Sequence, residues 1–380
     1  MRRTAAALAL LAVLALSRGC GRPGGAGAPA PRAETDTIPL AERRGIPGTI
    51  VFVSERDGDA EVYAVEPVGG APRRLTCDPA AQDYPAAVSP DGRTLALVSV
   101  REAAGAHRER LALLPVGGGR ARPLLAPGGR VRSPSWSADG RWLAFESDAA
   151  GFRDVFRVAA DGSGVRRLSR SPQGSFEPEV SPDGRRIAFA GSRGGDVEVY
   201  VMAADGSGER RLTAFHRDDW GPRWSPDGRT LAFLSDREGT DRVFLVGADG
   251  TGVRRLSRAA GGGHEAYPAW SPDGRRVAYT GRSGEGGWRV LVAEVATGAV
   301  REVRGAEQAS QPAWSPDGRH LAFMADADGD AEIWIARADG SGATRLTRSP
   351  GPDWLPRWAA PVSSPGRIPP SSAAARWQLK

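Results

Sequence analysis

The chain has 380 residues, with 50 Gly and 30 Pro, an abundance of turn formers that favours many short elements and argues against long helices. Its formal net charge is +6, yet the only Lys is Lys380, and the Arg residues are spread evenly rather than gathered into a basic stripe. We therefore expect no nucleic-acid partner.

The N-terminus, MRRTAAALALLAVLALSRGC, has the layout of a secretion signal. Arg2 and Arg3 precede an apolar run that is too short to span a membrane comfortably, which predicts a signal peptide over 1–19. Cys20 follows the small residue Gly19 and resembles the lipidated Cys of bacterial lipoproteins. We predict that Cys20 is lipidated and that this anchor is the only membrane contact; a plain secreted signal with an incidental Cys is the alternative.

Two segments lack apolar periodicity. Residues 20–47 are rich in Gly, Ala and Pro and predict a flexible tether. Residues 360–380 are rich in Ser, Pro and Ala and predict a disordered tail. The folded domain is therefore expected over 48–359.

One short turn recurs six times within that domain. It reads SADG at Ser137 and SPDG at Ser89, Ser181, Ser225, Ser271 and Ser315. Its Asp recurs at spacings of 48, 44, 44, 46 and 44 residues, a period typical of a propeller blade or a helical repeat. Each period holds four short apolar runs separated by Gly, Asp and Pro, and none is long enough for a helix. Each unit therefore predicts a four-stranded antiparallel meander, with strands a to d in chain order.

The two ends of the domain carry incomplete units. Three strands without a strand a precede the six complete units, within residues 49–76, and a lone strand a, LPRWA, follows them at 355–359. Joined together, the fragments make one more blade and hide both terminal edges. The sequence predicts an all-β, seven-bladed propeller with three-plus-one closure; a six-bladed ring with loose ends is the alternative.

The repeat PxWSPDGRxLAFxS…EVYVM…DGSGxRRLT resembles the WD-like propeller repeat of the TolB family over about 48–359. The same repeat occurs in the propeller halves of prolyl-oligopeptidase-like peptidases and in some polysaccharide lyases, so the resemblance implies the fold more strongly than the function. It implies an envelope propeller that binds protein, in the periplasm or at the cell surface of a bacterium.

An aromatic residue ends most a strands. We interpret this position as core between the blades, because it follows the strand period and Val replaces it twice. Its occupants are Val88, Trp136, Val180, Trp224, Trp270, Trp314 and Trp358.

Strand direction sorts the loops into two faces. The a–b and c–d turns share one face, here the turn face, and are nearly invariant. The d–a and b–c loops share the other, here the variable-loop face, and differ between blades, as binding loops usually do. Five d–a loops combine an acid with an aromatic residue where the chain enters the innermost strand. They are Asp83 with Tyr84, Glu177 with Phe176, Asp219 with Trp220, Glu265 with Tyr267, and Asp353 with Trp354.

These ten residues predict an acidic, aromatic funnel at the channel mouth that binds an envelope protein or peptide. In the alternative, the acids cap turns or pair with Arg residues of the b–c loops, and the aromatic residues plug the mouth. Those Arg residues are Arg56, Arg193, Arg237 and Arg282. The paired Arg residues of the RRL segments, on the outermost strands, are expected to form a solvated edge.

No catalytic motif emerges. A GxSxG elbow and an HExxH motif are both absent. His216 and His264 lie on d–a loops, but two His residues make a weak metal site, and we expect no metal, cofactor or catalytic residue. The sequence predicts a monomeric, non-enzymatic, extracytoplasmic binding scaffold; a propeller polysaccharide lyase or a carbohydrate-binding protein is the alternative.

Overall fold

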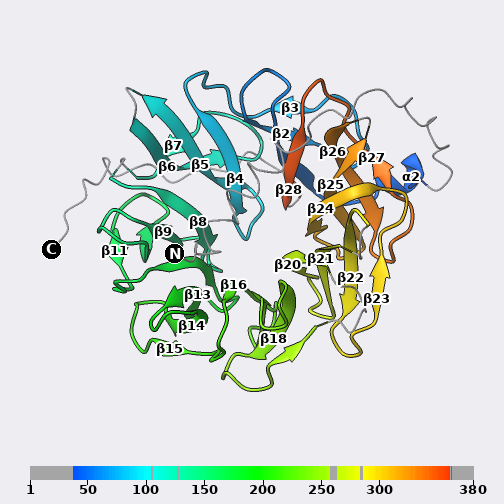
Figure 1. The fold of residues 1–380 in the computed structure, drawn as a ribbon. Helices are drawn as coiled ribbons and strands as arrows, with labels where there is room; N and C mark the ends of the chain where they lie inside the picture. Colours follow the sequence, from blue (N-terminus) through cyan, green and yellow to red (C-terminus); the bar gives the residue numbers. More distant parts are fainter. Residues whose placement is uncertain are drawn as a thin grey trace, which may run out of the picture. The chain divides into compact units, whose positions relative to one another are not determined.

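The computed structural model describes residues 37–103, 106–125, 128–256, 263–282, 286–327, 329–359 and 361. They belong to one compact unit. Seven four-stranded antiparallel sheets stand around a central axis, with one short helix, α2 (Leu40–Arg43), on the ring's periphery (Figure 1).

Each sheet is one blade, and its four strands run outward from the axis in the order a to d. The a strands of blades 1 to 7 are β28 (Asp353–Ala359), β4 (Gln82–Val88), β8 (Val131–Trp136), β12 (Ser175–Val180), β16 (Asp219–Trp224), β20 (Glu265–Trp270) and β24 (Glu307–Trp314). The b strands are β1 (Thr49–Ser54), β5 (Thr94–Ala103), β9 (Trp142–Ser147), β13 (Arg186–Ser192), β17 (Thr230–Ser235), β21 (Arg276–Arg282) and β25 (His320–Ala327).

The c strands are β2 (Glu61–Val65), β6 (Ala106–Pro115), β10 (Asp154–Ala159), β14 (Val197–Ala203), β18 (Arg242–Gly247), β22 (Trp288–Glu294) and β26 (Asp330–Arg337). The d strands, which are the shortest, are β3 (Arg73–Arg74), β7 (Arg122–Pro123), β11 (Arg166–Arg167), β15 (Arg210–Arg211), β19 (Arg254–Arg255), β23 (Val300–Glu302) and β27 (Thr344–Arg345).

Blade 1 combines the two ends of the domain. β28 pairs antiparallel with β1, and the register aligns Trp358 with Ile50 and Arg357 with Val51. The prediction of seven blades with three-plus-one closure is therefore confirmed, and the six-bladed alternative is wrong.

The recurring SPDG turn is closed by its own side chains. In blade 7 the Ser315 hydroxyl donates to Asp317 Oδ1 at 2.6 Å, and the same oxygen accepts the Arg319 N–H at 3.0 Å. Gly318 has φ of 67°, a left-handed conformation that favours glycine. The Ser hydroxyl, the Asp carboxylate and the Arg319 N–H pair within the hairpin, and the Gly318 carbonyl also accepts Arg276 Nη2 of blade 6 at 3.0 Å. These internal bonds explain why the turn recurs with little change on the turn face.

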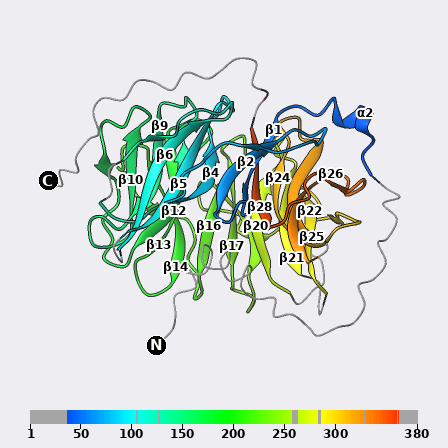
Figure 2. The ribbon, with the colours of Figure 1, turned by 90° about the horizontal axis from the view of Figure 1, so that it is seen from above.

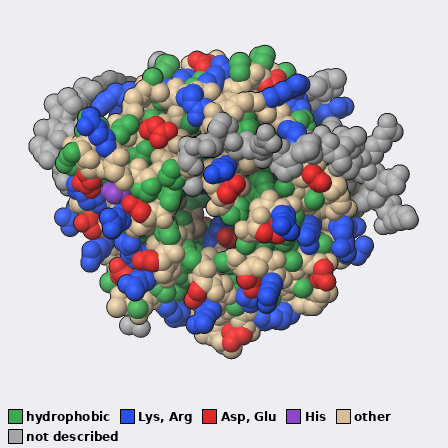
Figure 3. Space-filling model, turned by 180° about the vertical axis from the view of Figure 1, so that it is seen from behind, with side chains coloured by type: hydrophobic (Ala, Val, Ile, Leu, Met, Phe, Trp, Pro, Cys, Tyr) green, Lys and Arg blue, Asp and Glu red, His purple; other side chains and the backbone are tan. Residues whose placement is uncertain are grey.

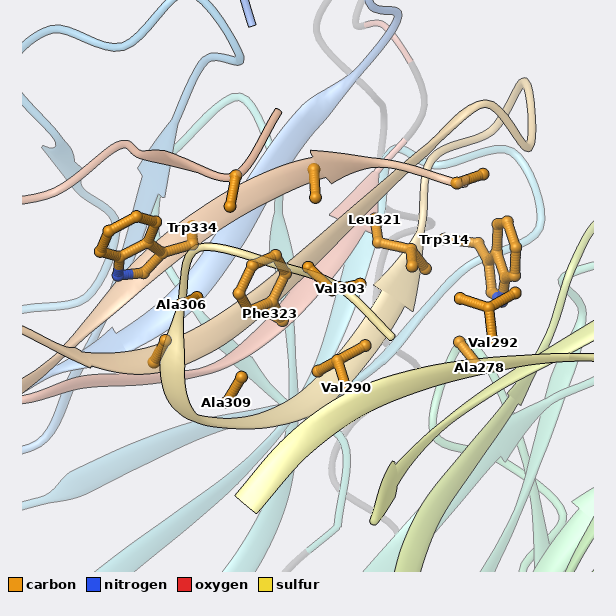
Figure 4. Packing of buried hydrophobic residues seen from close by; sticks show 14 residues of the cluster. Ala278, Val290, Val292, Val303, Ala306, Ala309, Trp314, Leu321, Phe323 and Trp334 are labelled. Carbon is orange, nitrogen blue, oxygen red and sulfur yellow. The ribbon is translucent and has the colours of Figure 1, made fainter. Parts of the chain in front are cut away.

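The core lies between neighbouring blades. Trp314 of β24 packs with Leu321 and Phe323 of its own blade against Ala278 and Val292 of blade 6 (Figure 4). Its indole N–H donates to a carbonyl of the previous a strand, Ala269 O, at 2.9 Å. The interpretation of the Trp position as core is thus confirmed, and the indole also links the blades. Trp224, Trp270 and Trp358 make equivalent hydrogen bonds.

A buried acid at the start of strand c ties down the outer strand. Glu332 is fully buried, accepts Arg345 Nη2 at 2.8 Å, and accepts the Thr347 hydroxyl at 2.6 Å. Glu61, Asp154 and Glu198 occupy the same position in other blades and accept a Thr or Ser hydroxyl in the same way. The expectation that the RRL arginines form only a solvated edge is therefore wrong for the second Arg of two segments, because Arg74 and Arg167 bind the strand c acid of their own blade.

The first Arg of several RRL segments reaches the next blade. The Arg73 guanidinium donates to the Val116 and Gly117 carbonyls at 3.1 Å, and Arg210 donates to the Asp249 carbonyl at the same distance. Several d strands are thus bound both to strand c of their own blade and to the next blade.

Residues 37–47, the end of the predicted tether, lie against blade 7. Ile38 is 1% exposed, and its N–H donates to Thr344 Oγ1 at 2.7 Å. Glu42 of α2 accepts Arg337 Nη2 at 2.6 Å, which places the helix beside the turn face (Figure 2). The predicted signal peptide, Cys20 and the rest of the tether lie outside the described residues, as does the predicted tail apart from residue 361.

Candidate binding site at the channel mouth

The a strands are bulged where they enter the channel from the variable-loop face. In six blades the residue before the strand a Pro has φ between 49° and 61°, and the pairing with strand b shifts at the same place. These residues are Ser133, Glu177, Gly221, Tyr267, Gln311 and Leu355. Left-handed backbone at non-glycine residues is costly and is typical of functional sites. The bulge breaks strand alternation at the mouth and decides which side chains face the lumen.

Four of the five predicted acids are buried in their own blades. Asp83, Asp219, Glu265 and Asp353 are at most 6% exposed. Asp353 accepts Arg56 Nη2 at 2.9 Å, and Asp219 accepts Arg237 Nη2 at 2.8 Å. Both arginines come from b–c loops, so these pairs fix each b–c loop to the start of strand a.

The other two buried acids are Glu265 and Asp83. Glu265 Oε2 accepts the N–H of Val243 at 2.7 Å. Burial raises the pKa of Asp83. These carboxylates therefore hold the loops in place and do not form an exposed acidic ring.

Glu177, the fifth acid, lies at the strand entry of blade 4. It is half-buried, and its backbone N–H donates to Glu146 Oε2 of the neighbouring blade at 2.7 Å. Burial raises the pKa of Glu146 to about 7, against the attraction of Arg153. Burial also raises the pKa of Glu177, against the attraction of Arg223. Blades 3 and 4 thus place two adjacent carboxyl groups at the mouth.

The aromatic residues divide into a packed and an accessible set. Phe176 is 3% exposed beneath the Arg153 guanidinium, which lies 4.5 Å from its ring centroid, and Trp220 is 9% exposed. Tyr84 of β4 and Trp354 of β28 are half-buried, with ring centroids 5.7 Å apart. Tyr267 is also half-buried. The structure therefore brings Tyr84 and Trp354 together as an aromatic pair across the junction of blades 1 and 2.

Sequence reasoning missed several charged residues at the channel. Arg132 pairs with Glu109 at 3.0 Å, and Glu179, Arg223 and Arg357 follow the strand a Pro. The sequence signal for Glu179, Arg223 and Arg357 was their position between a buried Pro and the core Val or Trp, because strand alternation turns that position toward the lumen.

The two His residues of the d–a loops do not meet as ligands. His264 Nδ1 lies 3.1 Å from Asp241, while Asp219 and Glu265, the acids considered beside them, are bound within their blades. Across the described ranges, no group of three or more His, Cys, Asp or Glu residues is placed to hold a metal ion. Within the same ranges, no helix is long and apolar enough to cross a membrane.

Sequence comparison decides the family. A family model described as the TolB beta propeller domain matches residues 169–285 and 263–364, together more than half of the chain. The chain belongs to the TolB β-propeller family. A second model, the beta-propeller domain of lipoprotein LpqB, matches residues 53–222 of this TolB-like chain. An uncharacterized protein of Agrobacterium fabrum is 32% identical over 133 residues, which are 34% of this chain and 43% of that protein.

Solved structures agree on the TolB-like fold. TolB from Acinetobacter baumannii superposes with a TM-score of 0.55 at 19% identity, over 87% of this chain and 89% of that one. An oligogalacturonate lyase in complex with manganese gives 0.60 at 16% identity, over 80% and 86%. A puromycin-hydrolyzing peptidase of Mycobacterium tuberculosis gives 0.60 at 20% identity, and the match covers 84% of this chain but only 55% of the peptidase. At these identities the similarity establishes the fold alone.

Proposed function

We propose that this TolB-like propeller is a non-enzymatic binding scaffold of the bacterial envelope that captures a protein or peptide at the mouth of its variable-loop face. The observation that carries the proposal is the Tyr84–Trp354 pair, two half-buried rings at 5.7 Å beside the channel. Paired, partly exposed aromatic residues are typical anchors of protein interfaces. Membership of the TolB family and the match to a lipoprotein propeller support a place outside the cytoplasm, with Cys20 as the anchor.

The charges around the pair favour a peptide with basic or amide groups. Tyr267 and Glu177 are the other accessible members of the predicted set. The half-buried carboxyl group of Glu177 offers an acceptor to N–H donors of a ligand. Because Asp219 and Asp353 are bound by arginines, we assign them to positioning the loops rather than to direct contact.

The test is photo-crosslinking in envelopes of the organism that encodes the chain. A photoreactive residue at position 84 should capture one partner, and Trp354→Ala should reduce that capture at least tenfold. Val253→Ala, an exposed change near a c–d turn, is the matched control and should leave capture unchanged. Equal capture by the wild type and Trp354→Ala, with both proteins folded, would remove the mouth as the binding site.

A carbohydrate-binding protein or polysaccharide lyase is the second candidate, because a half-buried aromatic pair can also stack on a sugar and an oligogalacturonate lyase shares the fold. Incubation with oligogalacturonate, followed by ultraviolet detection of an unsaturated product, distinguishes it from the scaffold. Product formed by the wild type and lost in Trp354→Ala would favour the lyase.

A further inference from the structure

Seven a-strand residues form one ring inside the channel, here the inner ring. Each is the residue just before the Trp or Val that ends the core-facing part of strand a, and each pairs with strand b at an equivalent place, as Arg357 with Val51 and Arg223 with Ala232. All seven are partly or fully exposed although they lie on innermost strands, so their side chains face the lumen. The members are Ala87, Ser135, Glu179, Arg223, Ala269, Ala313 and Arg357.

The charges on the inner ring do not cancel. Glu179 and Arg223, on neighbouring blades, approach to 4.0 Å, and Glu179 Oε2 also accepts the Trp224 N–H at 3.0 Å. Arg357 makes no ion pair with any residue in the described part of the chain; its Nη1 donates to the Pro356 carbonyl at 3.2 Å. Its neighbours on the ring are Ala313 and Ala87, which carry no charge. The ring therefore holds two cations and one carboxylate.

The two arginines influence one another through the lumen. Burial and, to a smaller extent, the positive charge of Arg223 lower the pKa of Arg357 to about 10, while Tyr267 opposes the change. Burial raises the pKa of Glu179 to about 7, so this carboxylate is only partly ionised near neutral pH. Two positive charges held in the same channel attract an anion to the space between them.

The ring is open to solvent. The Arg223 side chain is 45% exposed, although it points into the channel. Arg357 is followed by only Trp358 and Ala359 in β28, which places the ring toward the turn face. In Figure 3, the face seen from behind has a central hollow in which basic and acidic side chains are visible. A ligand can therefore reach the arginines without passing the aromatic mouth.

We propose that the inner ring is a carboxylate-binding site, in which Arg223 and Arg357 hold a single carboxylate of an acidic peptide that enters from the turn face. A guanidinium matches a carboxylate through two parallel N–H donors. With Glu179 ionised, one carboxylate neutralises the ring's excess charge, whereas a phosphate dianion would leave the ring with an excess negative charge. This site lies beyond the proposed function and does not depend on a partner at the variable-loop face.

The test is calorimetric titration of the full chain with tetraglutamate, and with tetraglutamine as the uncharged probe. The wild type should bind tetraglutamate saturably, with weakening in high salt, and should not bind tetraglutamine. Arg357→Gln should weaken binding at least tenfold. Arg275→Gln, an exposed Arg of the turn face with no side-chain contact among the described residues, should leave it unchanged.

A second variant guards against misfolding. Arg357→Lys keeps the charge but loses the planar fork, so its affinity should lie between those of the wild type and Arg357→Gln. No saturable tetraglutamate binding by the wild type, equal binding of tetraglutamine, or unchanged affinity in Arg357→Gln would overturn the site. If tetragalacturonate bound instead of tetraglutamate, with the same dependence on Arg357, a peptide ligand would be excluded. The bound carboxylate would then belong to an acidic sugar. Tyr84→Ala and Trp354→Ala should not affect tetraglutamate binding. A negative result for the inner ring can therefore be distinguished from a negative result for the aromatic mouth.

Discussion

Trp358 pairs in register with Ile50, and its indole N–H donates to the Ala313 carbonyl of blade 7 at 3.0 Å. One side chain near the end of the domain therefore holds both the first b strand and the neighbouring blade. Trp358 is 9% exposed and packs in the same cluster as Ile50 and Phe52.

The closing strand should be essential for folding. A chain that stops before Asp353 lacks β28 and exposes the edge of β1, which invites association between molecules. We expect this chain to unfold or aggregate, whereas a chain that stops after residue 361 should match the full chain. Light scattering and thermal unfolding measure the difference; a monomeric shorter chain with an unchanged Tm would contradict the closure.

Removal of the Trp358 side chain should leave a cavity between blades 7 and 1. We expect Trp358→Ala to lower the free energy of unfolding by about 3–5 kcal/mol. Trp354→Ala, in the same strand but half-buried at the mouth, should cost clearly less. Urea denaturation of both variants measures the contrast, and equal losses would remove the distinction between core and mouth.

The strand c acid should stabilise its blade strongly. Glu332→Ala leaves Arg345 and the N–H of Ser349 without their acceptor in a buried setting. We expect a loss of about 2–4 kcal/mol in the free energy of unfolding. Glu238→Ala, which removes an exposed partner of Arg255, should cost less than about 1 kcal/mol. A small loss in Glu332→Ala would show that these hydrogen bonds do little for stability.

Stability should fall as the pH rises toward neutrality because of Glu146. Its pKa is about 7 in the folded chain and 4.5 in the reference state, so the folded chain binds more protons between these values. Its stabilising contribution is full below pH 4.5 and is lost as the pH rises through 7. Glu146→Gln keeps an acceptor for the Glu177 N–H but carries no charge. The variant should therefore recover about 1–3 kcal/mol of the wild-type loss between pH 5 and 8. Thermal unfolding across this range tests the slope, and parallel curves would refute the assignment.

The segment before the first strand should contribute to stability. Ile38 is 1% exposed and packs with Ile46 and Leu346. Ile38→Ala should cost about 2–4 kcal/mol, whereas Leu40→Ala, at a residue that is 46% exposed, should be close to neutral. Denaturant unfolding compares the two, and a neutral Ile38→Ala would mean that the segment detaches without consequence.

The blades were predictable because each repeats the same turn and strand period, and because the end fragments add up to one sheet. The contacts of the predicted site residues were harder to predict from the sequence. The sequence shows that Asp353 and Trp354 are neighbours at a strand entry, but it does not show that a left-handed residue at Leu355 shifts the register. That shift turns Asp353 inward toward Arg56 and leaves Trp354 beside Tyr84.

The inner ring was missed for a related reason. Arg223 and Arg357 stand among many arginines, and only their register with strand b shows that both face one lumen. The pairing of Arg345 with Glu332 was equally hidden, because the two residues belong to different strands and neither is unusual in isolation.

The self-contained Ser–Asp turn has a consequence for how such rings grow. Because the Ser hydroxyl and Asp carboxylate of each turn pair within their own hairpin, a blade can be copied in tandem within the gene without a new partner for these two groups. Only blade 1 is built from both ends of the domain. Copies inserted anywhere among the six continuous units would therefore leave the pair of β28 and β1 intact. Divergence can then act on the loops of each copy separately, which is the pattern that the variable-loop face displays.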